Sequence, residues 1–195
     1  MRKWLTLAVL SLAQFLMVLD QAVMNVAISQ LVDDFDTTVT TIQGVITFYA
    51  LVMATMMITG GKIGDIIGRR RAFVVGLTIY GVGSALTAAS WNVTALLIGW
   101  SVLEGLGAAL VLPALVALLA ANYQGRDRVM AFGVIGGVAG VGIAAGPIIG
   151  GYFTTQLSWR WVFVGEVIVA LGIAAAARLV SDAKLEGRRP HLDVV

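Results

Sequence analysis

Three carboxylates occupy positions where a carboxylate is costly to place. Asp20, Glu104 and Glu166 each fall inside a long apolar stretch of the sequence. A charge at the centre of a bilayer costs at least about 2.5–3.5 kcal/mol, so such residues usually face a cavity or a polar partner. Surroundings of low dielectric constant favour the neutral form of a carboxyl group, which suits it to take up and release protons. We interpret Asp20 and Glu104 as candidate proton-binding residues, with hydrogen bonding between helices as the alternative.

Glu166 and Asn25 extend this set. Glu166 lies near the expected outer end of its stretch and close in sequence to Arg160. A position at the membrane interface and a functional role account for Glu166 equally well. Asn25 follows Asp20 on a nearby face of the same expected helix, because residues four or five apart lie on adjacent faces. We expect Asp20, Asn25 and Glu104 to line a common cavity, and we place Glu166 in the same cavity.

The composition requires a membrane environment. Of the 195 residues, 59% are hydrophobic and 12% are charged, whereas soluble domains carry about 25% charged residues. There is no cysteine, and the one histidine, His191, stands near the end of the chain. Disulfides, thiolate sites and histidine metal sites are therefore excluded, and no bound metal is expected.

Six segments are long and apolar enough to span a bilayer, which takes about 20 residues of helix. The segment 72–103 has no charged residue and is too long for one span, so Ser90, Trp91 and Asn92 are expected to break it into a tight hairpin. Residues 181–195 form a polar tail or linker. The expected spans are 5–28, 42–61, 72–90, 95–120, 129–151 and 160–180.

Lysine and arginine set the expected orientation. Alternate loops hold almost all of them, and the opposite loops hold only Arg160, while the loop 29–41 carries three aspartates. Cationic loops stay in the cytoplasm, so both termini should be cytoplasmic. We expect an all-α, multi-pass protein of the cell (inner) membrane. The same distribution argues against nucleic-acid binding.

Two glycine-rich segments have ordered spacings. The first, expected to be a short cytoplasmic turn between spans 2 and 3, contains Gly61, Gly64, Asp65, Gly68, Arg69, Arg70 and Arg71. A cationic loop that happens to be rich in glycine is the simpler alternative. The second, in span 5, contains Gly142, Gly146, Pro147, Gly150 and Gly151. There the proline should bend the helix, and the glycines should form a groove for another helix.

These segments together resemble the major facilitator superfamily, and specifically its drug:proton antiporter group. The segment 61–71 is similar to the signature Gly-x-Leu-x-Asp-Arg-x-Gly-Arg-Arg/Lys, with Ile63 and Ile66 as departures. The span 5 segment matches the antiporter signature Gly-x-x-x-Gly-Pro-x-x-Gly-Gly at every specified position. The run 19–29 resembles span 1 of the 14-span branch.

One departure concerns proton transfer. The family's span 4 pattern has an arginine where this chain has Ser101, and a glutamine where it has Glu104. Proton coupling therefore cannot be carried over through that arginine. We expect Glu104, with Asp20, to be the titrating site, and we place Ser101 in the same cavity.

The resemblance implies the N-terminal six-helix half of a secondary transporter. It implies proton-coupled efflux of drugs or other amphipathic molecules, with a proton gradient and no cofactor, and a second half or a homodimer partner. Asp65 and the following arginines would latch the cytoplasmic side. A non-transporting scaffold or fragment and an uptake carrier are the alternatives. Enzyme activity is not expected, since no catalytic motif is present.

Overall fold

The described part of the chain folds into six long helices. The computed structural model describes residues 2–182, and no strand occurs in that range. The elements are α1 (Arg2–Val26), α2 (Ile28–Asp34), α3 (Val39–Ile67), α4 (Arg69–Ala88), α5 (Val93–Leu96), η1 (Leu97–Glu104), α6 (Gly105–Asn122), α7 (Gly125–Gln156), α8 (Arg160–Ala176) and η2 (Ala177–Leu179). Because α5, η1 and α6 are continuous, the described range holds six helices that could cross a membrane. The predicted all-α, six-span fold is confirmed. Most of the predicted tail, His191 included, lies outside the described residues.

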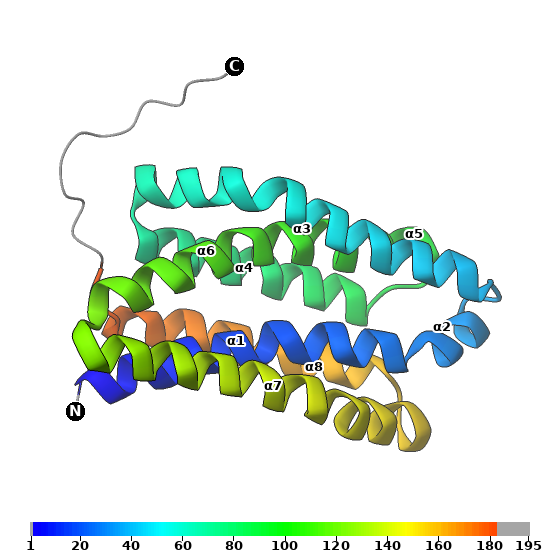
Figure 1. The fold of residues 1–195 in the computed structure, drawn as a ribbon. Helices are drawn as coiled ribbons and strands as arrows, with labels where there is room; N and C mark the ends of the chain where they lie inside the picture. Colours follow the sequence, from blue (N-terminus) through cyan, green and yellow to red (C-terminus); the bar gives the residue numbers. More distant parts are fainter. Residues whose placement is uncertain (1, 183–195) are drawn as a thin grey trace.

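The helices pack in two groups of three (Figure 1). Helix α1 packs along α7 and α8, while α4 and α3 both pack on α6. The groups meet mainly where α4 packs against α8. The first and last described residues lie at the same end of the bundle, as an even number of spans requires. Which side of the membrane that end faces stays a prediction.

Glycines bring α4 and α6 into backbone contact. A Cβ atom on Gly107 would lie 2.7 Å from the backbone nitrogen of Tyr80, and one on Gly76 would lie 2.9 Å from the carbonyl oxygen of Gly107. Such distances are too short for any side chain. In lipid, moving an apolar side chain from the acyl chains into a helix–helix contact gains little free energy, because both surroundings are apolar. Close backbone approach of this kind therefore stabilises the packing of the helices.

The break predicted at 90–92 is present. Helix α4 ends at Ala88 and α5 begins at Val93. The side chain of Asn92 accepts a hydrogen bond from the backbone N–H of Ala95 at 2.8 Å, which caps the new helix. The uncharged segment 72–103 is therefore a helical hairpin, as its sequence indicates.

The segment 61–71 is mostly helical rather than a loop. Helix α3 continues to Ile67 and α4 begins at Arg69, so the turn consists of Gly68, whose φ of 99° favours glycine. Arg69 forms an ion pair with Asp65 and donates to the carbonyl of Gly61 at 3.1 Å. This gives the predicted latch one internal ion pair.

Arg70 connects that segment to the residues that follow α8. The backbone N–H of Arg70 donates to Asp182 at 3.1 Å, and its guanidinium donates to the carbonyl of Val180 at 3.4 Å. Arg71 is exposed. The start of the segment that follows α8 is thereby tied to the first turn of α4.

The glycines of α7 form a groove for α1. Gly142, Gly146 and Gly150 are buried; Cβ atoms added at Gly142 and Gly150 would meet Val18 at 3.2 Å and Val23 at 3.3 Å, and one at Gly146 would overlap the side chain of Ala22. These contacts flank Asp20 on α1. Gly151 faces open space, and α7 continues through Pro147.

Gly146→Ala should therefore force α1 and α7 apart. Overpacking of this kind costs about 1–3 kcal/mol, so we expect a lower midpoint of thermal unfolding in detergent. Gly151→Ala, on the same helix, adds the same methyl group where nothing lies within 4 Å, and it should leave the midpoint unchanged. Equal midpoints for the two variants would show that the α1–α7 contact is not tight.

Candidate proton and substrate site

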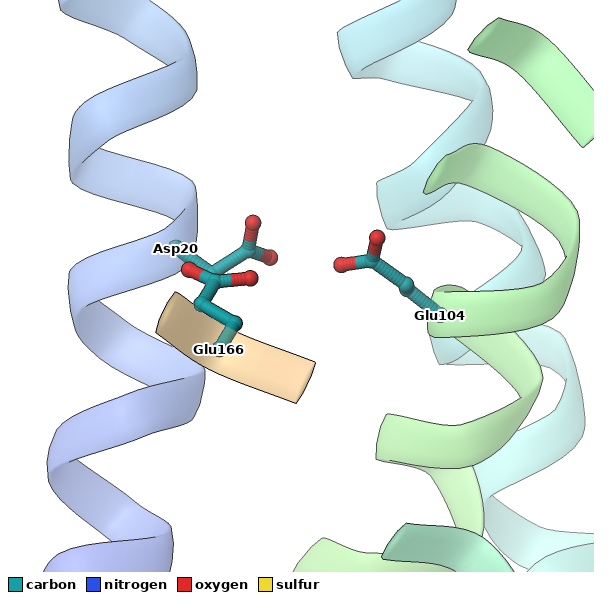
Figure 2. Close-up of side chains that lie close together, drawn as sticks. All are labelled: Asp20, Glu104 and Glu166. Carbon is teal, nitrogen blue, oxygen red and sulfur yellow. The ribbon is translucent and has the colours of Figure 1, made fainter. Parts of the chain in front are cut away.

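Three buried carboxylates meet inside the bundle (Figure 2). Asp20 comes from α1, Glu104 from the end of η1 and Glu166 from α8, and their side chains point toward one another. Asp20 and Glu104 are 0% exposed and Glu166 is 2% exposed. One oxygen from each lies within 4.8 Å of the others. The packing of α8 on α1 and α4, and of η1 on α4, thus brings these three carboxylates together inside the bundle.

Neutral side chains contact one oxygen of each carboxylate. The indole N–H of Trp100 donates to Asp20 at 2.8 Å, and Thr87 lies 2.9 Å from Glu104. One oxygen of Glu166 accepts from the hydroxyls of Tyr80 at 3.2 Å and Ser84 at 3.4 Å. The second oxygen of each carboxylate is buried without a partner: Oδ2 of Asp20, Oε2 of Glu104 and Oε1 of Glu166.

The contacts of Thr87 indicate which form of Glu104 fits. The Thr87 hydroxyl lies 2.9 Å from the carbonyl of Gly83 and 2.9 Å from Glu104. A hydroxyl has one hydrogen, and a carbonyl can only accept. A protonated Glu104 satisfies both contacts, because it donates to Thr87 while Thr87 donates to Gly83. If Glu104 is ionised, one of the two contacts of Thr87 has no hydrogen atom and cannot be a hydrogen bond.

No cationic side chain of residues 2–182 forms a salt bridge with the cluster. The salt bridges found in residues 2–182 lie elsewhere and join Lys3 to Asp127, Asp65 to Arg69, and Asp34 to Arg160. Two ionised carboxylates with oxygens within 4.8 Å of each other repel by about 3 kcal/mol at an effective dielectric constant of about 20. The cluster therefore favours states in which protons, or a cation from outside the chain, reduce its charge.

The structure separates the residues predicted from sequence. Asp20 and Glu104 lie together, as expected for a common site. Asn25 is exposed and donates to the backbone of its own helix at Gln21. Ser101 is buried and donates to the carbonyl of Val45 at 2.7 Å. Neither residue contacts a carboxylate of the cluster through a hydrogen bond.

Glu166 is buried inside the bundle, and Arg160 is not its partner. Arg160 pairs with Asp34 at 2.9 Å and donates to the carbonyl of Ser90 at 2.8 Å. Glu166 lies six residues further along α8, nearly two turns into the bundle. The interfacial alternative depended on closeness in sequence, whereas the helix carries the two side chains to different depths.

Several residues of the site were not predicted. Trp100, Thr87, Tyr80 and Ser84 hold the carboxylates, and Tyr49 stacks on Trp100 with ring centroids 4.4 Å apart. The Tyr49 hydroxyl is buried without a partner. Hydroxyl-bearing residues inside apolar spans are the sequence feature that could have indicated Thr87, Tyr80 and Ser84. The π-helical turns of η1, which lead directly to Glu104, have no evident sequence signal; such wide turns often occur at functional sites.

Gly83 provides the space for Glu104. A Cβ atom on Gly83 would lie 2.6 Å from Cγ of Glu104 and 2.8 Å from its backbone nitrogen. We expect Gly83→Ala to displace Glu104 and to lower stability by about 1–3 kcal/mol, measured by thermal unfolding. Gly81→Ala is the matched control on α4, because its Cβ would make an ordinary contact of 3.7 Å with Ala170. A Gly83→Ala variant as stable as the control would contradict the tight packing described.

Comparison with known proteins identifies the family. A family model of the Major Facilitator Superfamily matches residues 10–193, and the chain belongs to that superfamily. Its members are transporters, which confirms the prediction that the chain is not an enzyme. The chain is a multi-pass membrane protein.

Individual relatives agree with this assignment. The chain is 37% identical over 194 residues to a puromycin resistance protein of Streptomyces alboniger, covering 99% of this chain and 38% of that protein. It is 33% identical to a tetracenomycin C resistance and export protein of Streptomyces glaucescens, covering 99% and 36%. A crystal structure of a peptide transporter shares the fold, with a TM-score of 0.77 and 18% identity over 88% of this chain and 37% of that one. The chain thus spans well under half the length of these relatives.

Proposed function

We propose that this chain is one half of a proton-coupled exporter of amphipathic organic compounds in the cell membrane. The observation that carries the proposal is the buried cluster of Asp20, Glu104 and Glu166, which lacks a cationic partner in the described residues and has one free oxygen per carboxylate. The names of the relatives, which describe antibiotic resistance and export, support outward transport of small organic molecules.

In the proposed mechanism the cluster is occupied alternately by protons and by substrate. Protonation removes the repulsion between the carboxylates and favours the packed arrangement seen here. Loss of protons restores the repulsion between the carboxylates and so disfavours the contact between the two helix groups. This favours an arrangement that admits water or a substrate. Alternating access requires a second six-helix unit, either a following half or a second copy of this chain.

That the chain binds no metal and no cofactor stays a prediction. Three carboxylate oxygens within 4.8 Å are compatible with a cation, but protons reduce their charge equally well. We propose that the proton gradient is the energy source.

Transport in inverted membrane vesicles tests the proposal. Vesicles from cells that express the chain should accumulate puromycin when a proton gradient is imposed, acid inside, and adding puromycin should dissipate that gradient. Accumulation only with the opposite gradient would indicate an uptake carrier. Absence of both effects, with the chain inserted and folded, would favour a non-transporting protein.

A further inference from the structure

Arg160 joins three segments at the end of the bundle opposite the described termini (Figure 1). It is the first residue of α8. Its guanidinium pairs with Asp34 of α2 at 2.9 Å and donates to the carbonyl of Ser90, between α4 and α5, at 2.8 Å. It also lies over the ring of Trp159, 4.4 Å from the centroid, and the Trp159 indole donates to Asp34 at 2.8 Å. The position of Ser90 therefore depends on an ion pair between α2 and α8.

Ser90 extends this contact to the last turn of α4. Its hydroxyl donates to the carbonyl of Thr87 at 2.8 Å, and its backbone N–H donates to the same carbonyl at 3.1 Å. Both residues are buried. The Thr87 hydroxyl in turn lies 2.9 Å from Glu104. A continuous series of contacts thus connects the ion pair of Arg160 with one member of the carboxylate cluster.

We propose that Arg160 is a positioning residue for Glu104 and acts through Ser90 and Thr87. This role rests on the proposed function, in which Glu104 takes up and releases a proton, and it concerns the regulation of that site. While Arg160 holds Ser90, the Thr87 hydroxyl can accept a hydrogen bond from protonated Glu104. When α8 moves away from the break between α4 and α5, Thr87 shifts and the proton on Glu104 loses its acceptor. Separation of these segments then favours release of the proton.

The packing around Thr87 restricts the direction in which it can move. A Cβ atom on Gly99 of η1 would lie 2.8 Å from the hydroxyl oxygen of Thr87 and 2.8 Å from its backbone nitrogen. The end of α4 is therefore already as close to η1 as a glycine permits. A shift of the break between α4 and α5 should lengthen the contact between Thr87 and Glu104, because it cannot shorten it.

The other titratable groups near Glu104 come from α1, α3, α4 and α8. Asp20 and Glu166 complete the cluster, Tyr80 donates to Glu166, and Tyr49 stacks on Trp100. Helices α5 and α6 contain no ionisable residue. Loss of the Thr87 contact removes a hydrogen bond that only the protonated form of Glu104 can donate, so Glu104 should ionise at lower pH.

The pH dependence of the thermal unfolding midpoint of the full chain in detergent tests this role. In the wild type the midpoint should fall as the cluster ionises. Arg160→Met removes both polar contacts of Arg160, and Asp34→Asn removes the ion pair. Each should move the pH range of the fall to lower pH, by about half a unit or more for Arg160→Met, because protonated Glu104 loses one hydrogen bond. A direct effect of charge would instead move the range in opposite directions, since the two substitutions change the net charge in opposite senses.

A double-substitution cycle tests the route through Thr87. Thr87→Val keeps the shape of the side chain without its hydroxyl, and it should move the range to lower pH by itself. Arg160→Met should then add no further shift, because both substitutions act on one contact. Asp34→Asn completes the same cycle if Arg160→Met does not fold. Lys3→Gln is the matched control, because it breaks the exposed ion pair with Asp127 at the other end of the bundle and should leave the range in place.

Three results would overturn the role of Arg160. Shifts in opposite directions for Arg160→Met and Asp34→Asn would indicate an effect of charge alone. Additive shifts of Arg160→Met and Thr87→Val would exclude the route through Thr87. A lower midpoint with an unmoved pH range would indicate a purely structural residue. A wild-type midpoint independent of pH is a different outcome, because it would contradict proton binding by the cluster and the role of Arg160 with it.

Discussion

Glu104→Gln should reduce proton-coupled transport to the level of vesicles that lack the protein. Glutamine keeps the size of the side chain and its contact with Thr87, and it cannot release a proton. Substrate binding should remain, since the fold and the apolar surfaces are unchanged. The measurement is puromycin-induced dissipation of an imposed proton gradient, together with a separate binding assay.

The matched control is Asp33→Asn, which removes an exposed carboxylate in the connection between α1 and α3. It should transport as the wild type does. If Glu104→Gln transported puromycin with the wild-type dependence on pH, Glu104 would not be the coupling residue. If Asp33→Asn also lost transport, general loss of negative charge would explain both variants.

Raising the pH should destabilise the bundle through the carboxylate cluster. As Asp20, Glu104 and Glu166 ionise, repulsion of up to about 3 kcal/mol arises between a pair of them. For a chain of this size each kcal/mol lowers the unfolding midpoint by about 2–4 °C. We therefore expect the midpoint in detergent to fall by several degrees between weakly acidic and weakly alkaline solution.

The double variant Glu104→Gln/Glu166→Gln should abolish most of this dependence, because one carboxylate then remains and has no like charge beside it. Asp33→Asn should retain it. A midpoint that rises with pH in the wild type, or a slope unchanged in the double variant, would contradict the electrostatic description of the cluster.

The sequence predicted the fold well because hydropathy and span length are local properties. The uncharged segment 72–103 could be divided at Ser90–Asn92, and the structure confirms the division, with Asn92 as the cap of the next helix. The segment 61–71 was harder to predict. Its glycines suggested a loop, yet helical hydrogen bonds continue to Gly68, where the chain turns in one residue.

The site was only half predictable, because its assembly depends on helix packing. Asp20 and Glu104 were recognisable as charges inside apolar spans. Glu166 was placed in the same cavity, but an interfacial carboxylate remained an alternative, because no local pattern reports that α8 packs on α4. Trp100 gave no signal as a ligand of Asp20, since a tryptophan in a membrane span is most simply an apolar residue. The groove of Gly142, Gly146 and Gly150 was predictable as a packing surface, but its occupant, α1, was not.

Counting the protons released when substrate binds would show whether the carboxylate cluster titrates. Puromycin is added to the purified chain in weakly buffered detergent solution, and protons released on binding are followed with a pH indicator. We expect release from the wild-type chain and a clear reduction in a Glu104→Gln variant that still binds puromycin. Binding without proton release in the wild type, or equal release from the variant, would contradict it.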